Sequence, residues 1–143
     1  QRALDRVEGE AGRRGLSVRC LRADANTLDA FEPAAFDLVT AHYASIPRTP
    51  DDRGMRNLLD AVAPGGRLLF VGHDIEAMRA PVDTRTHSRP FDPDAYLRLD
   101  DVRAALLDSP LWELEVDEKR PRPEGAASHH VHDVILRARR VPV

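Results

Sequence analysis

The sequence predicts an α/β fold, a three-layer sandwich in which a mostly parallel sheet ends in an antiparallel C-terminal hairpin. Helical and strand-like apolar spacings alternate along much of the chain, and two strand patterns without a helix between them close it. The nearly all-apolar run 67–72 suits a strand covered on both faces, as in a parallel sheet. We therefore expect ligands to bind outside the carboxyl ends of the parallel strands.

The first half of the chain supplies a helix and two strands. Residues 1–14 carry apolar side chains on one stripe, and Gly15 suits the end of that helix because glycine accepts left-handed backbone. Residues 16–20 alternate apolar and polar side chains, which predicts a strand containing a buried Cys20. Residues 36–41 form a second, compact apolar strand.

The second half repeats the alternation and then closes the sheet. Asp51 or Asp52 is expected to cap a helix that ends before the tight turn at residues 64–66. Residues 73–98 contain three prolines and no clear period, so we expect a long loop that is functional or mobile, either a substrate loop or a loop of solvated charges. The remaining expected elements are a helix capped by Asp100 and strands at 112–116 and 131–138.

Composition fits one domain spanning residues 1–143 and excludes several classes of partner. The net charge of −3 offers no positive field for nucleic acid or an anionic membrane surface. The lone cysteine rules out an internal disulfide and is compatible with a reducing cytosol, so a cytoplasmic location is expected. No apolar run approaches the roughly 20 residues of a membrane span. The oligomeric state is left open.

Four segments, read together, resemble a class I S-adenosylmethionine-dependent methyltransferase. The helix, Pro-Gly-Gly turn and apolar strand of residues 58–74 form the most family-like piece. Within the family the chain is most similar to small-molecule methyltransferases of the tellurite-resistance or thiopurine type. The resemblance implies a Rossmann-like sheet, S-adenosylmethionine as cofactor and a small-molecule methyl acceptor. The segments are residues 22–25, 36–43, 58–74 and 133–139.

The chain departs from the family pattern at its start. No glycine-rich turn follows a first strand, and no acidic residue ends a second one, although the family binds methionine and ribose there. We therefore expect an N-terminally incomplete domain that is inactive alone, whose parent protein transfers methyl groups. The alternatives are a non-catalytic binding or interaction remnant of the same scaffold and a nicotinamide-dependent oxidoreductase.

The resemblance assigns cofactor binding to residues after two of the strands. Asp24 would accept the adenine amino group, and the backbone N–H of Ala25 would serve a ring nitrogen. Thr40 and Ala41 would line the cofactor after their strand. The alternative for Asp24 is a cap on the following loop, a common role for this residue type.

Two further pairs are candidates for catalysis and substrate binding. His42 could act as a general base, because its unperturbed pKa lies near neutrality, and Tyr43 could pack over the sulfonium methyl. Packing or hydrogen bonding is the alternative for His42. His73 and Asp74 end an apolar strand and are candidates for substrate binding, although neighbouring strand residues point to opposite faces.

No resident metal is expected. Three histidines and an aspartate gather near the C-terminus, but zinc ligands usually come as separated pairs and no complementary pair is present. The cluster consists of His129, His130, His132 and Asp133, and we expect a junction between loop and strand there, near the mouth of the pocket.

Overall fold

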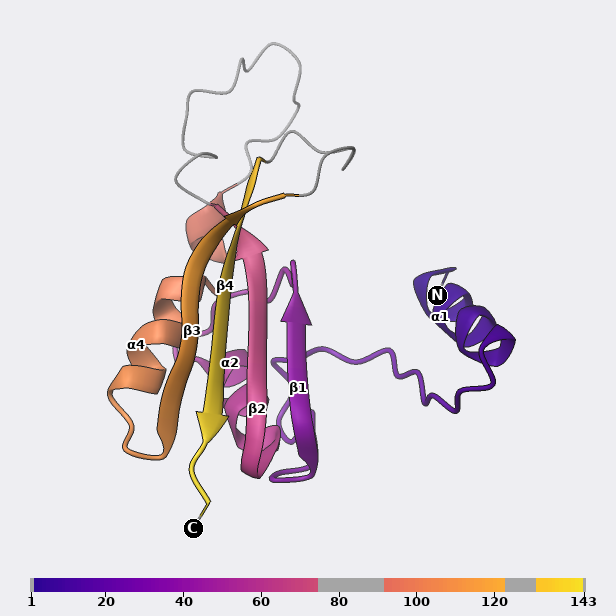
Figure 1. The fold of residues 1–143 in the computed structure, drawn as a ribbon, viewed down its shortest axis with the longest axis horizontal. Helices are drawn as coiled ribbons and strands as arrows, with labels where there is room; N and C mark the ends of the chain where they lie inside the picture. The colour runs from indigo at the N-terminus through magenta and orange to yellow at the C-terminus, as the bar shows by residue number, and fades with distance from the viewer. Residues whose placement is uncertain (1, 75–91, 123–130, 143) are drawn as a thin grey trace.

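The computed structural model describes residues 2–74, 92–122 and 131–142, and a four-stranded sheet forms its centre (Figure 1). The sheet order is β1-β2-β4-β3; β1 pairs with β2 in parallel, and β4 runs antiparallel to both β2 and β3. The predicted α/β class and closing hairpin are confirmed. The described sheet is mixed, with one parallel pair. The strands are β1 (Phe36–His42), β2 (Val62–His73), β3 (Trp112–Pro121) and β4 (His132–Arg140).

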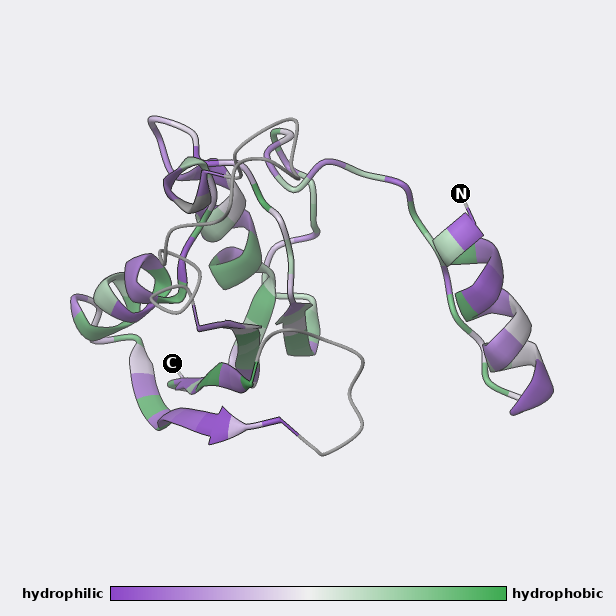
Figure 2. Cartoon of the chain, turned by 90° about the horizontal axis from the view of Figure 1, so that it is seen from above, coloured by the Kyte–Doolittle hydropathy of each residue, from purple (hydrophilic) through white to green (hydrophobic). Residues whose placement is uncertain are grey.

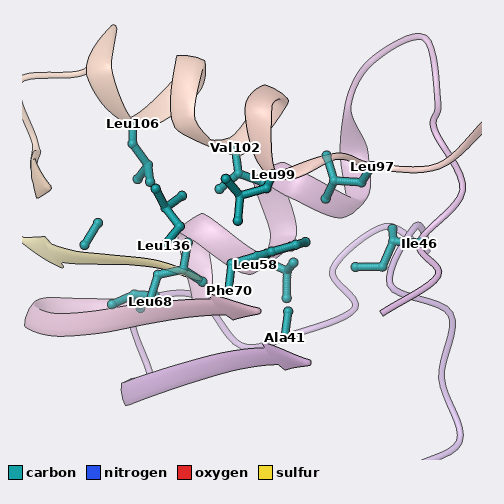
Figure 3. Close-up of a cluster of buried hydrophobic side chains, with 12 residues drawn as sticks. Ala41, Ile46, Leu58, Leu68, Phe70, Leu97, Leu99, Val102, Leu106 and Leu136 are labelled. Atoms are coloured by element: carbon teal, nitrogen blue, oxygen red, sulfur yellow. The ribbon is translucent and has the colours of Figure 1, made fainter. Parts of the chain in front are cut away.

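Two helices cover one face of the sheet. They are α2 (Arg53–Ala61) and α4 (Leu99–Leu107), the latter preceded by the short 3-10 helix η1 (Pro93–Ala95). Strand alternation turns Leu68 and Leu136 toward these helices, where both side chains are almost completely buried (Figure 3). This single apolar interface holds the described core together.

The caps of the two helices differ from those expected. The Thr49 hydroxyl, and not a side-chain oxygen of Asp51 or Asp52, accepts the N–H of Arg53 at 2.9 Å, and Asp52 adopts left-handed backbone. At α4 the carboxylate of Asp101 accepts the N–H of Arg98 at 2.9 Å. In both cases several neighbouring polar side chains could cap the helix, and the conformation of the preceding loop decides which of them does so.

The opposite face of the sheet is not covered by any described helix (Figures 1 and 2). Leu38 is 57% exposed there, and Arg67 and Arg137 pair with Glu115 across the same face. The described residues thus form two layers. The three-layer sandwich remains a prediction.

Helix α1 (Arg2–Arg13) lies apart from the sheet in both views (Figures 1 and 2). Gly15 ends this helix with a φ of 66°, as predicted, and the N–H of Leu16 donates to the carbonyl of Ala11 at 2.9 Å in the C-terminal cap. The segment that follows runs back along the helix, since the Cys20 thiol lies 4.0 Å from the carbonyl oxygen of Leu4. The strand expected at residues 16–20 is wrong, and Cys20 is half-buried in no strand. An alternating segment becomes a strand only by pairing, and no described strand lies beside it.

Candidate functional site

The carboxyl ends of β1 and β2 lie at one edge of the sheet, where β4 begins (Figure 1). The two ends lie together because β1 and β2 are parallel. Their hydrogen-bond ladder continues past the end of β1, since the N–H of Tyr43 donates to the carbonyl of Val71 at 2.8 Å. In the antiparallel register His73 stands opposite Asp133. Tertiary structure therefore gathers residues from three distant parts of the chain.

Four side chains at this edge form one connected group, which we call the Tyr43 cluster: Tyr43, His73, Arg122 and Asp133. The Tyr43 hydroxyl donates to Oδ2 of Asp133 at 2.8 Å. The Tyr43 ring stacks on His73 with centroids 4.6 Å apart, and Cζ of Arg122 lies 5.2 Å from the Tyr43 centroid. Nε of Arg122 is 3.4 Å from Oδ2 of Asp133. The cluster combines aromatic faces with one ion pair.

Tyr43 reaches Asp133 from an unusual backbone conformation. Its φ is 50°, in the left-handed region that residues other than glycine seldom adopt. Strained backbone of this kind persists where surrounding contacts determine it, often at functional sites. Here the hydrogen bond and the stacked ring are contacts that can hold it.

The phenol of Tyr43 stays protonated over a wide pH range. The hydrogen bond to Asp133 raises the pKa of Tyr43 above its usual value, and partial burial adds to the effect. Tyr43 is therefore a hydrogen-bond donor near neutral pH. Its ring remains neutral and presents an electron-rich face.

Asp133 keeps acceptor capacity within the cluster. Its Oδ2 faces both Tyr43 and Arg122, whereas its Oδ1 is buried and has no hydrogen-bond partner among the described residues. A buried acceptor without a donor is costly, so such atoms are often matched by a ligand or an ordered water.

The two residues predicted to bind substrate have different surroundings. His73 belongs to the Tyr43 cluster, whereas the carboxylate of Asp74 forms an ion pair with Lys119 of β3. The strand has ended after His73, so both side chains remain at this edge. Their roles in substrate binding stay predictions.

Asp24 lies in a turn that is tied to the same end of the sheet. Its Oδ1 accepts the N–H of Asn26 at 2.9 Å, which is the loop-capping role, and the residue is exposed. The Asn57 amide of α2 donates to the carbonyl of Ala25 at 2.7 Å, and the Asn26 amide donates to the carbonyl of Pro47 at 3.0 Å. The turn is thus fixed to the segment that follows β1.

Strand alternation separates the residues at the end of β1. Ala41 is 5% exposed and faces the helices, so it could meet a cofactor only through its backbone. Thr40 and His42 are exposed on the uncovered face. The cofactor role of Thr40 and Ala41 and the base role of His42 stay predictions.

The only Gly-Gly pair in the sequence lies at the opposite edge of the sheet. A Cβ on Gly66 would come within 3.0 Å of the carbonyl oxygens of Ala63, Asp37 and Phe36, so glycine is required there for close strand approach. The tight turn predicted at residues 64–66 is wrong, because these residues lie within β2, where its pairing with β1 shifts register. They serve packing at the amino end of β2, far from the Tyr43 cluster along the strand.

Sequence reasoning missed Arg122, and it placed Asp133 near the mouth of the pocket without assigning it a role. Arg122 falls beside a proline-rich stretch that resembles any polar loop, and Asp133 reads as a strand residue next to histidines. No local pattern connects either residue with Tyr43, which is 90 positions from Asp133. In the described ranges no group of three metal-ligating side chains occurs; His129 and His130 lie outside them.

Solved structures share this arrangement of elements. A SAM-dependent methyltransferase from Methanosarcina mazei has a TM-score of 0.63 at 16% identity, over 100% of this chain and 79% of that chain. The chain has a methyltransferase-like fold. The [4+2]-cyclase SpnF has a TM-score of 0.61 at 18% identity, over 98% of this chain and 63% of its own.

A third similar structure is that of a protein from echinomycin biosynthesis concerned with converting a disulfide bond into a thioacetal group. Its TM-score is 0.57 at 21% identity, over 97% of this chain and 63% of its own. The chain thus spans less than two thirds of that protein and of the cyclase. No family model and no curated protein sequence matches the chain. None of the helices in the described ranges is both long and apolar enough to span a membrane.

Proposed function

We propose that the chain is part of an S-adenosylmethionine-dependent methyltransferase that acts on a small molecule, of the tellurite-resistance or thiopurine type. The observation that carries the proposal is the Tyr43 cluster at the carboxyl edge of β1 and β2, in a fold similar to methyltransferases. Ligands of open α/β sheets bind at this edge. The three-layer sandwich and the cytoplasmic location belong to the same proposal.

The residues at this edge fit the adenine part of the cofactor. Asp24 is exposed and keeps a carboxylate oxygen, Oδ2, beyond the one used in its turn, so it can accept an amino group. Ala25, next in the chain, is held by Asn57 and packs against the core. Thr40 and Ala41 would lie beside the cofactor. A preorganised turn of this kind lowers the entropy cost of binding.

The chain's own residues would orient the substrate and accept its proton. Bound S-adenosylmethionine supplies an electrophilic methyl group, so positioning of the nucleophile accounts for much of the rate. His42, exposed at the end of β1, would accept a proton from the acceptor group if that group carries one. Tyr43 would present its ring to the reacting centre, and His73 and Asp74 would contact the substrate. No metal is assigned a role.

Calorimetric titration of the purified chain with S-adenosylmethionine and S-adenosylhomocysteine tests the proposal. We expect Asp24→Ala to weaken binding of both ligands about tenfold or more, because an amino group would lose a charged acceptor. Glu32→Ala removes an exposed carboxylate from the same loop and is the matched control. Equal affinities for Asp24→Ala and the unaltered chain would contradict the adenine assignment.

A parallel titration with oxidised and reduced nicotinamide dinucleotides addresses the main alternative. Binding of these dinucleotides in preference to S-adenosylmethionine would favour an oxidoreductase. Binding of no cofactor would favour a non-catalytic scaffold.

A further inference from the structure

Two stretches of backbone that could pair as strands have no strand partner among the described residues. One is the outer edge of β1, which ends the sheet order on that side. The N–H of Tyr43 donates to β2, so alternation along the strand turns the N–H and carbonyl groups of Leu38 and Thr40 away from β2. The other is residues 16–20, which alternate apolar and polar side chains. Unpaired edges of this kind invite pairing with another chain.

The two edge strands of the sheet differ in their protection against such pairing. In β3, six of the ten residues are charged, and charged side chains are a common means of keeping an edge strand from associating. In β1, Asp37 is the single acidic residue, and there is no lysine or arginine. Phe36 and Leu38 of β1 are 42% and 57% exposed. The outer edge of β1 therefore lacks the protection that β3 has.

The N-terminal part of the chain and the region around β1 are complementary in charge. Residues 2–22 contain six arginines and three acidic residues, whereas residues 23–42 contain four acidic residues and no lysine or arginine. Arg19 and Asp37 are both exposed, and neither belongs to an ion pair among the described residues. Val18, next to Arg19, is 46% exposed. The segment thus offers the positive charge and the apolar surface that β1 can match.

Antiparallel pairing of residues 16–20 with β1 matches both properties in a single register. Setting Val18 opposite Leu38 places Arg19 opposite Asp37, because residues along two antiparallel strands advance in opposite directions. Apolar cross-strand pairs and pairs of opposite charge each stabilise a sheet. The side-chain pattern of the segment therefore fits the free edge of β1.

The same register brings α1 onto the uncovered face of the sheet. In an extended segment Cys20 lies on the same side as Val18, and its thiol is 4.0 Å from the carbonyl oxygen of Leu4 in α1. Leu38, opposite Val18 in this register, is exposed on the uncovered face. Helix α1 would then cover apolar side chains that no described helix covers.

The antiparallel direction requires a second copy of the chain. Within one chain the segment leads to Ala25 and Asn26, which are tied to Asn57 and to Pro47 beyond the carboxyl end of β1. It therefore runs toward that end, in the same direction as β1, and it lies apart from the sheet (Figures 1 and 2). A copy related by a two-fold axis perpendicular to the sheet presents the segment in the opposite direction.

We propose that two copies of this chain form a dimer by exchanging residues 2–22. In each copy, residues 16–20 of the other pair with the free edge of β1, and the other copy's α1 covers the uncovered face. Two-fold symmetry makes the contact reciprocal, so it forms twice and closes the assembly as a dimer. The dimer requires neither a cofactor nor a substrate, and it stands or falls separately from the proposed function.

Sedimentation equilibrium of the 143-residue chain over the micromolar range measures the association. We expect an equilibrium between monomer and dimer. Arg19→Glu and Asp37→Arg should each weaken it about tenfold, because each places like charges opposite one another at both symmetry-related contacts. The double variant, Arg19→Glu with Asp37→Arg, restores opposite charges and should associate like the unaltered chain.

Two control variants make the same changes of charge outside the contact. Arg6→Glu and Asp108→Arg alter exposed residues and should leave the association unchanged. Circular dichroism checks that every variant is folded. A chain that stays monomeric at all concentrations overturns the proposal and leaves the β1 edge to a different partner. Association that the double variant does not recover, or that the controls weaken equally, also overturns it.

Disulfide cross-linking tests the register directly. In a chain that carries Cys20→Ser, the pair Val18→Cys and Leu38→Cys should give a covalent dimer on oxidation, because residues opposite one another on paired strands are within disulfide reach. Val18→Cys with Val131→Cys is the matched control, since Val131 is exposed and lies outside the contact. Non-reducing electrophoresis separates the products. Equal cross-linking of both pairs, or a bridge within one chain, overturns the proposed exchange.

Discussion

Two arginine–aspartate pairs, Arg103–Asp117 and Arg122–Asp133, contain the same functional groups and have different geometries. Arg103 of α4 contacts both carboxylate oxygens of Asp117 and also pairs with Asp100. The pair joins a helix to the sheet on the covered face. Arg122 approaches one oxygen of Asp133 at 3.4 Å and lies over an aromatic ring instead.

Residue type alone therefore does not decide whether an arginine–aspartate pair fixes two elements of the fold relative to one another. A bidentate pair fixes two elements relative to one another and uses the directional capacity of both partners. The contact between Arg122 and Asp133 lacks this fork geometry, because one nitrogen approaches one oxygen at 3.4 Å. The same two functional groups thus make a bidentate link on the covered face of the sheet and a longer contact beside an aromatic ring at its carboxyl edge.

The largest expected loss of stability comes from a substitution in the core on the covered face of the sheet, where the Arg103–Asp117 pair also lies. Leu136 is fully buried and stands opposite Asp117 in the β3–β4 register. Leu136→Ala should lower the free energy of unfolding by about 2–5 kcal/mol, because it leaves a cavity in the core. Urea denaturation measures the change. Ile135→Ala, on the uncovered face, should cost clearly less; equal losses would contradict the assignment of the two faces.

The two ion pairs should differ in how much each contributes to the free energy of unfolding. Arg103→Gln should cost about 1 kcal/mol, near the upper limit for pairs of this exposure because the contact is bidentate. The coupling energy between Arg122 and Asp133, obtained from a double-mutant cycle, should be less than about 0.5 kcal/mol, since their contact is long. Urea denaturation of all variants under the same conditions provides the comparison. A coupling energy for Arg122 and Asp133 above the loss in Arg103→Gln would contradict the difference between the two pairs.

The stabilisation by the Arg103–Asp117 pair should be lost at low pH. The Arg103 guanidinium lowers the pKa of Asp117 below its usual 3.8. Because the folded pKa is depressed, the stabilisation is present above pH 3.8 and is lost as the pH falls through the folded value. The difference in unfolding free energy between the unaltered chain and Asp117→Asn should therefore shrink below pH 3.8. A difference that is constant down to pH 2 would show that the pair is not formed.

The smallest effect concerns the titration of Tyr43. Its pKa is raised, so the stabilisation from its hydrogen bond is complete below pH 10 and is lost only as the pH rises through the higher folded value. Asp133→Asn should move the pKa of Tyr43 back toward 10. Ultraviolet absorbance follows the phenolate, and subtraction of the Tyr43→Phe curve removes the contribution of Tyr96. An unchanged midpoint would mean that Asp133 does not accept from Tyr43.

The fold could be read from the sequence to a large extent because its strongest signals are local. The apolar run of β2 and the alternation in β3 depend on neighbouring residues, and both strands contain the residues that the pattern predicts. Both are longer than predicted, because β2 begins at Val62 instead of residue 67 and β3 ends at Pro121 instead of residue 116. Residues 16–20 show equally clear alternation and form no strand. Strand formation needs a pairing partner, which no local pattern specifies.

Only some residues of the candidate site could be predicted from the sequence. Tyr43 and His73 follow strands whose carboxyl ends the parallel arrangement brings together, so the sequence could name them. The sequence also predicted Asp24 as a site residue. The turn that contains it is held in place by hydrogen bonds from the amides of Asn26 and Asn57. Those asparagines, like Arg122, carry no pattern that distinguishes them from ordinary surface residues.

By itself the sequence determined the α/β class, the closing hairpin and the strand ends at which polar residues gather, because periodicity and turn chemistry are local properties. Only the tertiary structure decided that Asp133 receives the Tyr43 hydroxyl and that Arg122 lies over its ring. Those contacts arise because β4 enters the sheet beside β2 with one particular register. Register depends on the packing of whole strand faces, and so it brings together residues that the chain keeps far apart.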